Sequence, residues 1–457
     1  SLQAMAMAPS ALALLALTTV LATVLALPTT VVVNPNLINL KFDFTQTFKT
    51  LDKALLQAQL VVNNTDAAWT AYTKDSKVTA LFPTLRTLST TENARRFTIF
   101  KANAAEVLKI NLVKNQEWFA GLGPYSHLDW SEFSALTRAI PEPDNTLAPP
   151  TARDWPGLKE PTTGVDLRPA TGKFMIDISG KGTQQIFTGI NTGILDGLNN
   201  NINLNPIGRK LKALRGMEGA RRGRELQQAP TSSKIDWTSK AGPVRNQGQC
   251  GSCWAFAAVG AIEALYRITG KNSNPDFSEE QIVDCCDIWR FYWSWACDGG
   301  YTSEALRYAK NNGLAAESKY PYKVSDSDSC NSWSWTSGAA RAGSGDAIRD
   351  YGKVSSNNYV HLANSVRVNP TTISFRVVDS FRWYSGGVYS SSGCGGSTNH
   401  AMLVVGYDTT ASVPYWKIKN SWGTGWGESG YIRVKMIKST SSSGMCGMYS
   451  NAHRPWL

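Results

Sequence analysis

Histidine is scarce in this chain of 457 residues, which holds only four of them. The pair Cys250-x-x-Cys253 has no second Cys pair and no histidine set at metal-ligand spacing, so the sequence does not favour a zinc site and we expect no metal or cofactor. The scarcity also makes each histidine easy to weigh as a catalytic base. His127 lies far upstream, His361 sits in a helix-like stretch and His453 is four residues from the C-terminus, which leaves the fourth as the candidate.

Charged side chains are absent from residues 1–40, and residues 5–27 are almost wholly apolar or Thr. Val24-x-Ala26 followed by Leu27-Pro28 fits a signal-peptidase site, so we expect residues 1–26 to be a signal peptide that sends the protein into the secretory pathway, to a lysosome or vacuole or outside the cell. The starting Ser and the missing basic region suggest a truncated N-terminus. Because the apolar run is near the length of a membrane span, an uncleaved anchor is the alternative.

A cysteine directly before a tryptophan is the most informative feature that is present. The stretch Gln247-Gly-Gln-Cys250-Gly-Ser-Cys253-Trp254-Ala-Phe256 opens an Ala-rich apolar run ending at Gly270, which predicts a helix. Cys253 then stands in the first turn, where backbone N–H groups and the helix dipole stabilise a thiolate, the nucleophilic form of cysteine. The alternative interpretation is a structural cysteine packed beside a buried tryptophan.

The fourth histidine, His400, opens the run at 401–407, which is rich in strand formers and predicts a buried strand. It follows Cys253 by 147 residues, within the roughly 130–150 expected of such a nucleophile and base. The next predicted strand, at 415–419, ends in Asn420, the natural partner for the second ring nitrogen of His400, and Trp422 can shield that bond from water. Alone, this segment would suit a Gly-rich hairpin.

Taken together, residues 234–455 resemble the papain-like cysteine peptidases of the cathepsin L type. The resemblance implies an α+β fold of two subdomains, one helical and one a β-barrel-like sheet from about Val368, with the cleft between them. It makes Cys253 the nucleophile, His400 the imidazole and Asn420 its orienter. Gln247, six residues before Cys253, becomes the side-chain donor of an oxyanion hole. The implied function is peptide hydrolysis by acyl transfer, and an inactive binding or inhibitor protein on the same fold is the alternative.

The eight cysteines fit the same resemblance. It implies three disulfides, Cys250–Cys297, Cys285–Cys330 and Cys394–Cys446, and leaves Cys253 outside them. Because Cys285 and Cys286 are adjacent, either one could take the bridge to Cys330.

The resemblance also assigns substrate-binding positions, where glycines let a peptide backbone approach and small side chains suit a hydrophobic P2 residue. These positions are Gly299, Gly300, Tyr301, Thr302, Ser374, Thr398, Ala401, Asn451 and the shielding Trp422. Between Cys286 and Cys297 lies an unusually aromatic segment. It is either a loop packed on its own domain or an aromatic rim on the non-prime side of the cleft.

Upstream, steps of three and four place six residues on one face of a helix, in a pattern that resembles the pro-region motif of cathepsin L-like zymogens. They are Glu92, Arg96, Phe100, Asn103, Val107 and Asn111. A second element, Gly123-Pro-Tyr125-Ser-His127-Leu-Asp129, keeps the first Gly and the last Asp but replaces the usual Asn and Phe. The implied role is an intramolecular inhibitor that lies backwards through the cleft until acid releases it.

The expected domains are therefore a propeptide at 27–140 with a helical core at 63–133, a connector at 141–228 and a peptidase at 229–457. The connector is rich in Pro, Gly and Asn and ends in two basic clusters, at 209–215 and 221–224, which carry much of the net charge of +11. Basic clusters can bind nucleic acid. We instead expect a protease-sensitive maturation junction, protein or peptide substrates, no nucleic acid, and a monomer that meets a membrane only if the first segment stays as an anchor.

Overall fold

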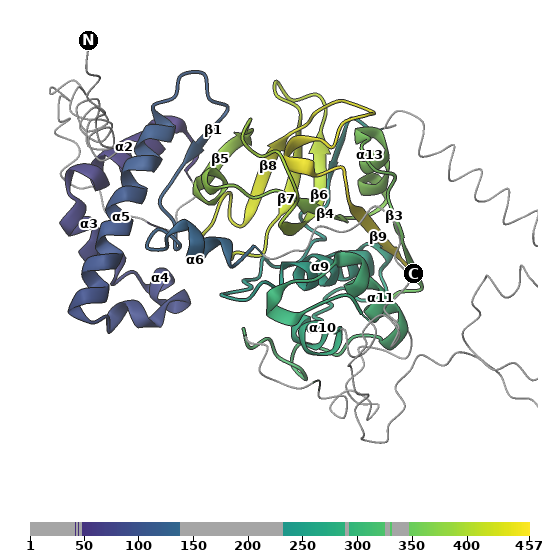
Figure 1. The fold of residues 1–457 in the computed structure, drawn as a ribbon. Helices are drawn as coiled ribbons and strands as arrows, with labels where there is room; N and C mark the ends of the chain where they lie inside the picture. Colours follow the sequence, from purple (N-terminus) through teal and green to yellow (C-terminus); the bar gives the residue numbers. More distant parts are fainter. Residues whose placement is uncertain are drawn as a thin grey trace, which may run out of the picture. The chain divides into compact units, whose positions relative to one another are not determined.

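The computed structural model describes residues 42, 44, 48–137, 232–287, 292–324, 330 and 347–457 (Figure 1). The expected signal or anchor at 1–26, the connector at 141–228 and part of the aromatic loop lie outside these residues. From Phe44 on, the described residues belong to one compact unit. No helix in these ranges combines the length and hydrophobicity needed to cross a bilayer.

The region predicted to be a propeptide, called the propeptide below, is built from helices with one short strand before the last of them. Its elements are α2 (Leu51–Asn63), α3 (Thr65–Tyr72), α4 (Ser76–Leu81), η2 (Pro83–Arg86), α5 (Thr90–Asn111), β1 (Trp118–Ala120) and α6 (Trp130–Ser134). Ser89 caps α5 by accepting a hydrogen bond from the Glu92 N–H, and an acidic side chain in the first turn suits the helix dipole. Helical structure in this region begins at Leu51, whereas the sequence predicts a helical core that begins at residue 63.

Three of the six motif residues of α5 bond to later segments of the propeptide, and Asn103 among them binds the second pro-region element. Arg96 pairs with Glu92 at 2.6 Å and with Glu132 at 2.7 Å. Asn103 donates to the carbonyls of Ser126 and Leu128, both at 3.0 Å. Further along, Asn111 exchanges two hydrogen bonds with Ala120, while Phe100 and Val107 are buried. The predicted face of α5 is therefore the face that contacts the later segments of the propeptide.

The peptidase region opens with β2 (Lys234–Asp236) and three helices that pack together, α9 (Cys253–Thr269), α10 (Glu279–Cys285) and α11 (Thr302–Asn312) (Figure 1). α9 ends as predicted at Gly270, whose φ of 72° is a left-handed cap. Its first fourteen residues are all buried, because helices contact one side of it and strand β6 the other. The short turn η4 (Ala296–Asp298) leads into α11.

The sheet subdomain begins at Asp350, before the predicted start at about Val368, and is formed by the remaining elements. They are β3 (Asp350–Lys353), α13 (Tyr359–Val368), β4 (Thr371–Phe375), η5 (Asp379–Trp383), β5 (Tyr384–Tyr389), β6 (His400–Asp408), β7 (Tyr415–Lys419), β8 (Tyr431–Lys435), η6 (Met445–Gly447) and β9 (Ala452–Trp456). The sheet order is β1-β5-β8-β7-β6-β4-β9-β3, with β2 paired to β6. Helices beside a mainly antiparallel sheet make the fold α+β, as predicted.

Strand β1 of the propeptide extends the peptidase sheet by pairing antiparallel with β5. Gly387 lies opposite Trp118 with a φ of +88°, and a Cβ atom there would stand 2.4 Å from the Glu117 carbonyl oxygen. Glu117 also pairs with Lys435 at 2.9 Å. The missing side chain of Gly387 therefore lets the propeptide backbone dock edge to edge, and the ion pair adds to this contact.

We expect Gly387→Ala to loosen this docking, since it adds a steric clash to a left-handed conformation that costs an L residue about 1–3 kcal/mol. The urea midpoint for propeptide release, measured by tryptophan fluorescence, should fall. Gly395→Ala is the matched control because its Cβ would meet nothing within 4 Å. Equal midpoints for the two variants would show that the edge pairing does not secure the propeptide.

Candidate active site

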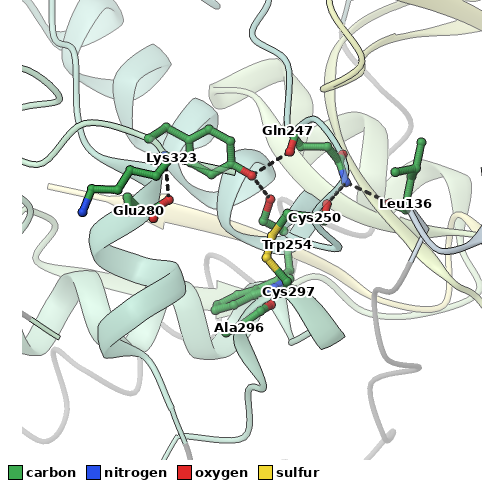
Figure 2. Close-up of a disulfide and its surroundings, with 10 residues drawn as sticks. Leu136, Gln247, Cys250, Trp254, Glu280, Ala296, Cys297 and Lys323 are labelled. Atoms are coloured by element: carbon green, nitrogen blue, oxygen red, sulfur yellow. Dashed lines mark hydrogen bonds between the residues drawn. A yellow bond between two sulfur atoms is a disulfide. The ribbon is translucent and has the colours of Figure 1, made fainter. Parts of the chain in front are cut away.

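Cys253 is the first residue of α9 and is fully buried in the structure. No acidic residue lies in the first turn of this helix to oppose an anion there. The loop before it is fastened by the Cys250–Cys297 disulfide (Figure 2). The Gly251 N–H also donates to the Cys297 carbonyl at 3.0 Å. These links join the start of α9 to the segment that holds Gly299 and Gly300.

Gln247 reaches the site from the preceding loop and is fully buried. Its Nε2 donates to the Cys250 carbonyl and to the Leu136 carbonyl of the propeptide, each at 2.8 Å (Figure 2). The Ser421 hydroxyl donates to its Oε1 at 2.6 Å, which fixes the direction of the amide. The amide nitrogen is therefore shared between the propeptide chain and its own loop.

His400 lies at the start of β6, where the sequence predicts it, but it is fully buried rather than accessible. Its Nε2 lies 2.8 Å from Asn420 Oδ1, which also accepts from the Ser421 N–H at 2.9 Å. An amide oxygen only accepts, so Nε2 carries a proton and the neutral ring keeps its lone pair on Nδ1. That Nδ1 is buried with no hydrogen-bond partner among the described residues.

Burial lowers the pKa of His400 to about 4, against the opposing effect of the Asn420 hydrogen bond. Trp422 packs on the imidazole with ring centroids 4.9 Å apart and is itself fully buried. The propeptide supplies the next layer, because Phe133 and Tyr125 lie edge-on to Trp422 at 5.0 and 6.1 Å. The neutral imidazole is thus enclosed by rings on the propeptide side.

Comparisons with known proteins identify the family. Residues 231–456 match the family model described as papain family cysteine protease. The chain is 38% identical over 232 residues to thiol protease aleurain of Arabidopsis thaliana, an alignment covering 49% of this chain and 62% of that protein. It is 37% identical over 237 residues to the cathepsin L-like proteinase of Fasciola hepatica, covering 51% of this chain and 68% of that protein.

The chain belongs to the papain family of cysteine proteases. Two solved structures share its fold. The recombinant stem bromelain precursor has a TM-score of 0.58 at 24% identity, covering 87% of this chain and 99% of that one. The digestive procathepsin L2 proteinase from Tenebrio molitor larval midgut has a TM-score of 0.55 at 25% identity, covering 87% and 100%. The match to aleurain spans about three fifths of that relative's length.

All three disulfides that the family resemblance implies are present: Cys250–Cys297, Cys285–Cys330 and Cys394–Cys446. Cys285 takes the bridge that sequence left open between two neighbours. Cys286 is buried outside the disulfides, with its sulfur 3.8 Å from the Ser294 hydroxyl, and burial holds its pKa well above the ordinary value. A thiol in that environment is a poor nucleophile.

Several residues assigned to substrate binding lie near one another. Ser374 on β4 pairs with Ala401 on β6, and the Ser374 N–H donates to the Asn451 carbonyl at 2.9 Å. Gly300 packs so closely on Trp254 that a Cβ would stand 2.7 Å from the indole, so no larger residue fits without a shift. Thr398 lies beside Gly447, while Tyr301 caps α11 and Thr302 begins it.

Three further residues support the site and were missed from the sequence. The Tyr322 hydroxyl donates to the Gln247 carbonyl at 2.7 Å and lies 2.7 Å from the Ser252 hydroxyl, so it links the loop to the start of α9. Ser421 joins Gln247 to the Asn420 segment. His453 Nδ1 lies 3.4 Å from the Thr302 hydroxyl, although its place near the C-terminus indicated no role. Tyr and Ser hydroxyls give no sequence signal of this kind.

Charged groups, most of them buried, line a small cavity together with Asn420. Lys419 donates to the Ala241 carbonyl at 2.8 Å, and burial lowers its pKa to about 8. Arg245 contacts Glu263 at 3.2 Å and Glu279 at 3.4 Å. These groups line a cavity of about 20 Å³ together with Asn420 and Ser421. Within the described ranges, no group of three or more His, Cys, Asp or Glu is placed to hold a metal ion.

Proposed function

We propose that this protein is a cysteine endopeptidase made as an inactive zymogen. The observation that carries the proposal is the His400–Asn420 hydrogen bond of 2.8 Å, which leaves the Nδ1 lone pair as the acceptor for a proton. Cys253 stands at the helix terminus that stabilises its thiolate. Cys253, His400 and Asn420 thus supply a nucleophile, a base and an orienter, the three parts that covalent catalysis by a thiol requires.

The reaction is acyl transfer. The Cys253 thiolate attacks the peptide carbonyl carbon while His400, as imidazolium, holds the proton. Gln247 Nε2 and the Cys253 backbone N–H donate to the oxyanion, each contribution being about 2.7–4 kcal/mol in comparable sites. His400 then gives its proton to the leaving amine, and afterwards removes a proton from the water that hydrolyses the thioester.

The propeptide supports the zymogen part of the proposal because it occupies these groups directly. The Leu136 carbonyl accepts a hydrogen bond of 2.8 Å from Gln247 Nε2, the donor that an oxyanion would need. Earlier residues, Leu128 and Phe133, lie at Arg382 and Trp422. In a substrate, the acyl part of the peptide, which binds at Gln247, is N-terminal to the cleaved bond. The leaving part, which lies beside His400, is C-terminal to that bond. The propeptide therefore passes the site in the opposite direction, which presents no bond in the orientation that cleavage needs.

Burial also disfavours the charged state that Cys253 and His400 need for catalysis. The thiolate–imidazolium pair requires a charged ring, and burial of His400 disfavours that charge. Removal of Phe133 and Tyr125 would admit water to this side of Trp422 and make the ion pair less costly. Latency thus has both a steric and an electrostatic cause.

The remaining assignments follow the family pattern. We propose that Gly299, Gly300, Tyr301, Thr302, Ser374, Thr398, Ala401 and Asn451 bind substrate and favour a hydrophobic P2 side chain. Trp295 lies edge-on to Tyr301 at 6.4 Å, which supports an aromatic rim beside this pocket. We further propose secretory-pathway targeting, since disulfides form in oxidising compartments, and a monomer whose partners are peptide substrates and its own propeptide.

Asn420→Ala tests the orienting role. We expect a loss in kcat of roughly 10–100-fold on a peptide with a hydrophobic P2 residue, since the ring would lose its fixed tautomer, and an altered acid limb of the pH profile. Asn420→Asp, which keeps the acceptor, should recover part of the rate. Rates are measured on acid-activated enzyme normalised to reactive thiol. Wild-type rates and an unchanged pH profile for the alanine variant would contradict the assignment.

A further inference from the structure

Arg382, on η5, is a buried arginine whose guanidinium contacts both the propeptide and the peptidase. It is 6% exposed. Its Nη1 donates to the Leu128 carbonyl at 2.9 Å and its Nη2 to Asn103 Oδ1 at 3.2 Å. The guanidinium also lies 5.7 Å from the Phe133 ring centroid. All three of these contacts disappear when the propeptide is removed.

The peptidase itself keeps the rest of this arginine fixed. Asp379 Oδ1 lies 2.7 Å from Nε, and the guanidinium stacks over Trp383 at 4.1 Å. The Trp426 indole N–H donates to the Arg382 carbonyl at 3.1 Å. Loss of the propeptide would thus expose two N–H groups of a guanidinium that remains held from behind. A fixed guanidinium fork is suited to bidentate binding of a carboxylate.

Aromatic rings packed one on another connect this guanidinium fork to the catalytic histidine. Trp422 packs on His400 at 4.9 Å, and Phe133 packs on Trp422 at 5.0 Å. Arg382 borders the same Phe133 ring. Since His400 must protonate the leaving amine, the leaving segment of a substrate has to pass on the Trp422 side and take the space that Phe133 fills.

We infer that Arg382 is a specificity-determining residue of the mature enzyme, which binds a carboxylate carried by the leaving segment of the substrate. The inference rests on the proposed peptidase function. The carboxylate has two possible sources, an Asp or Glu side chain or the free C-terminus of a short leaving segment. Asp379 is the competing anion, and its side chain is 47% exposed even in the zymogen.

The test uses acid-activated enzyme, with active sites counted by thiol titration, and peptides cleaved at one bond. One series carries Glu or Gln at the first, second or third position after that bond, with an amidated end. A second series ends two residues after the bond in a free acid or an amide. At about pH 6, where carboxylates are ionised, kcat/KM should favour the acid over its neutral partner roughly tenfold in one of the series. The series that responds identifies the source.

Variants assign this preference to the guanidinium. Arg382→Gln should bring the ratio close to one, and Arg382→Lys, which keeps the charge without the fork, should give an intermediate ratio. Asp379→Asn should raise the ratio by removing the competitor. Arg349→Gln removes a charge from an exposed site of the same domain and should leave the ratio unchanged, which controls for net charge.

An acid-to-neutral ratio that is the same in the wild type and in Arg382→Gln would overturn the inference, as would a loss equally large in Arg349→Gln. Failure of the proposed function looks different, because the wild type would then cleave none of the peptides. If Arg382→Gln does not fold, as judged by circular dichroism, the Arg382→Lys and Asp379→Asn ratios decide. An absence of change in both would also refute the inference.

Discussion

Cys253→Ala should reduce peptide hydrolysis by more than about 10⁴-fold while the protein keeps its fold. The thiolate is the only proposed nucleophile, so its removal leaves only the residual effects of oxyanion and substrate binding. The volume change is small, and Cys253 sits at the end of α9, where Ala is a good helix former.

The measurement compares acid-treated wild type and variant on one peptide, with circular dichroism as the check on folding. Cys286→Ala is the matched control, since that thiol is also buried and outside the disulfides but lies in no proposed catalytic contact. We expect it to retain activity. Equal losses in the two variants would point to packing rather than to chemistry.

His127→Phe should make the zymogen markedly more resistant to acid. His127 stands where the related pro-region motif has Phe, and it is 3% exposed. Its Nδ1 lies 2.8 Å from the Tyr72 hydroxyl, which itself donates to the Pro124 carbonyl at 2.7 Å. The hydroxyl proton is thus already used, so Nδ1 is the donor and Nε2 is the free base of a neutral ring.

Burial is the main reason that the pKa of His127 falls to about 3, and Arg96 adds to the effect while Glu132 opposes it. The carboxylates of Glu92 and Glu132 and the guanidinium of Arg96 line the adjoining cavity of about 410 Å³. The Phe82 ring lies edge-to-face with the imidazole, with ring centroids 4.4 Å apart, and carries no charge. Because Glu92 and Glu132 are already paired with Arg96, burial dominates and a positive charge on the His127 ring is disfavoured.

The sign follows from linkage. A histidine with a pKa of about 3 folded and about 6.5 unfolded leaves the propeptide fully stable above pH 6.5. As the pH falls, the unfolded state binds the proton first, and stability falls by about 1.4 kcal/mol per pH unit, or about 4–5 kcal/mol by pH 3. The Asp129 and Glu132 carboxylates, whose pKa values are lowered, act in the same direction at more acidic pH.

We therefore expect the pH of half-maximal zymogen conversion to shift downward in His127→Phe, by about one unit or more. Conversion is followed by gel electrophoresis across pH 3–7. In a Cys253→Ala background, where no self-cleavage occurs, the urea midpoint at pH 5 should be higher for the Phe variant. His361→Phe, on α13 of the peptidase, serves as the control. Identical conversion curves for wild type and His127→Phe would rule out this histidine as an acid trigger.

Sequence alone predicted the parts of the site that have a strong local pattern. The apolar run after Cys253 predicted α9, and the strand formers after His400 predicted β6, because burial on every side requires continuous apolar residues. The six spaced residues of α5 predicted its packed face. These features depend on periodicity, which a single sequence shows directly.

Other parts depend on contacts between distant segments and could not be predicted. Tyr322 lies 75 residues after Gln247 yet bonds to it, and Arg382 lies 254 residues after Leu128. Nothing in the local sequence distinguishes these side chains from surface residues. The choice of Cys285 over Cys286 is likewise a matter of which sulfur faces Cys330, a property of the turn that ends α10.

The most direct test of the account is the reaction of Cys253 with iodoacetamide before and after acid activation, mapped by mass spectrometry of peptides. The account predicts that Cys253 resists the reagent in the zymogen, where it is fully buried, and reacts after activation with a parallel loss of peptide hydrolysis. Cys286 should remain unmodified in both states. An activated enzyme that keeps its activity with Cys253 alkylated, or a Cys253 that reacts equally fast in the zymogen, would contradict it.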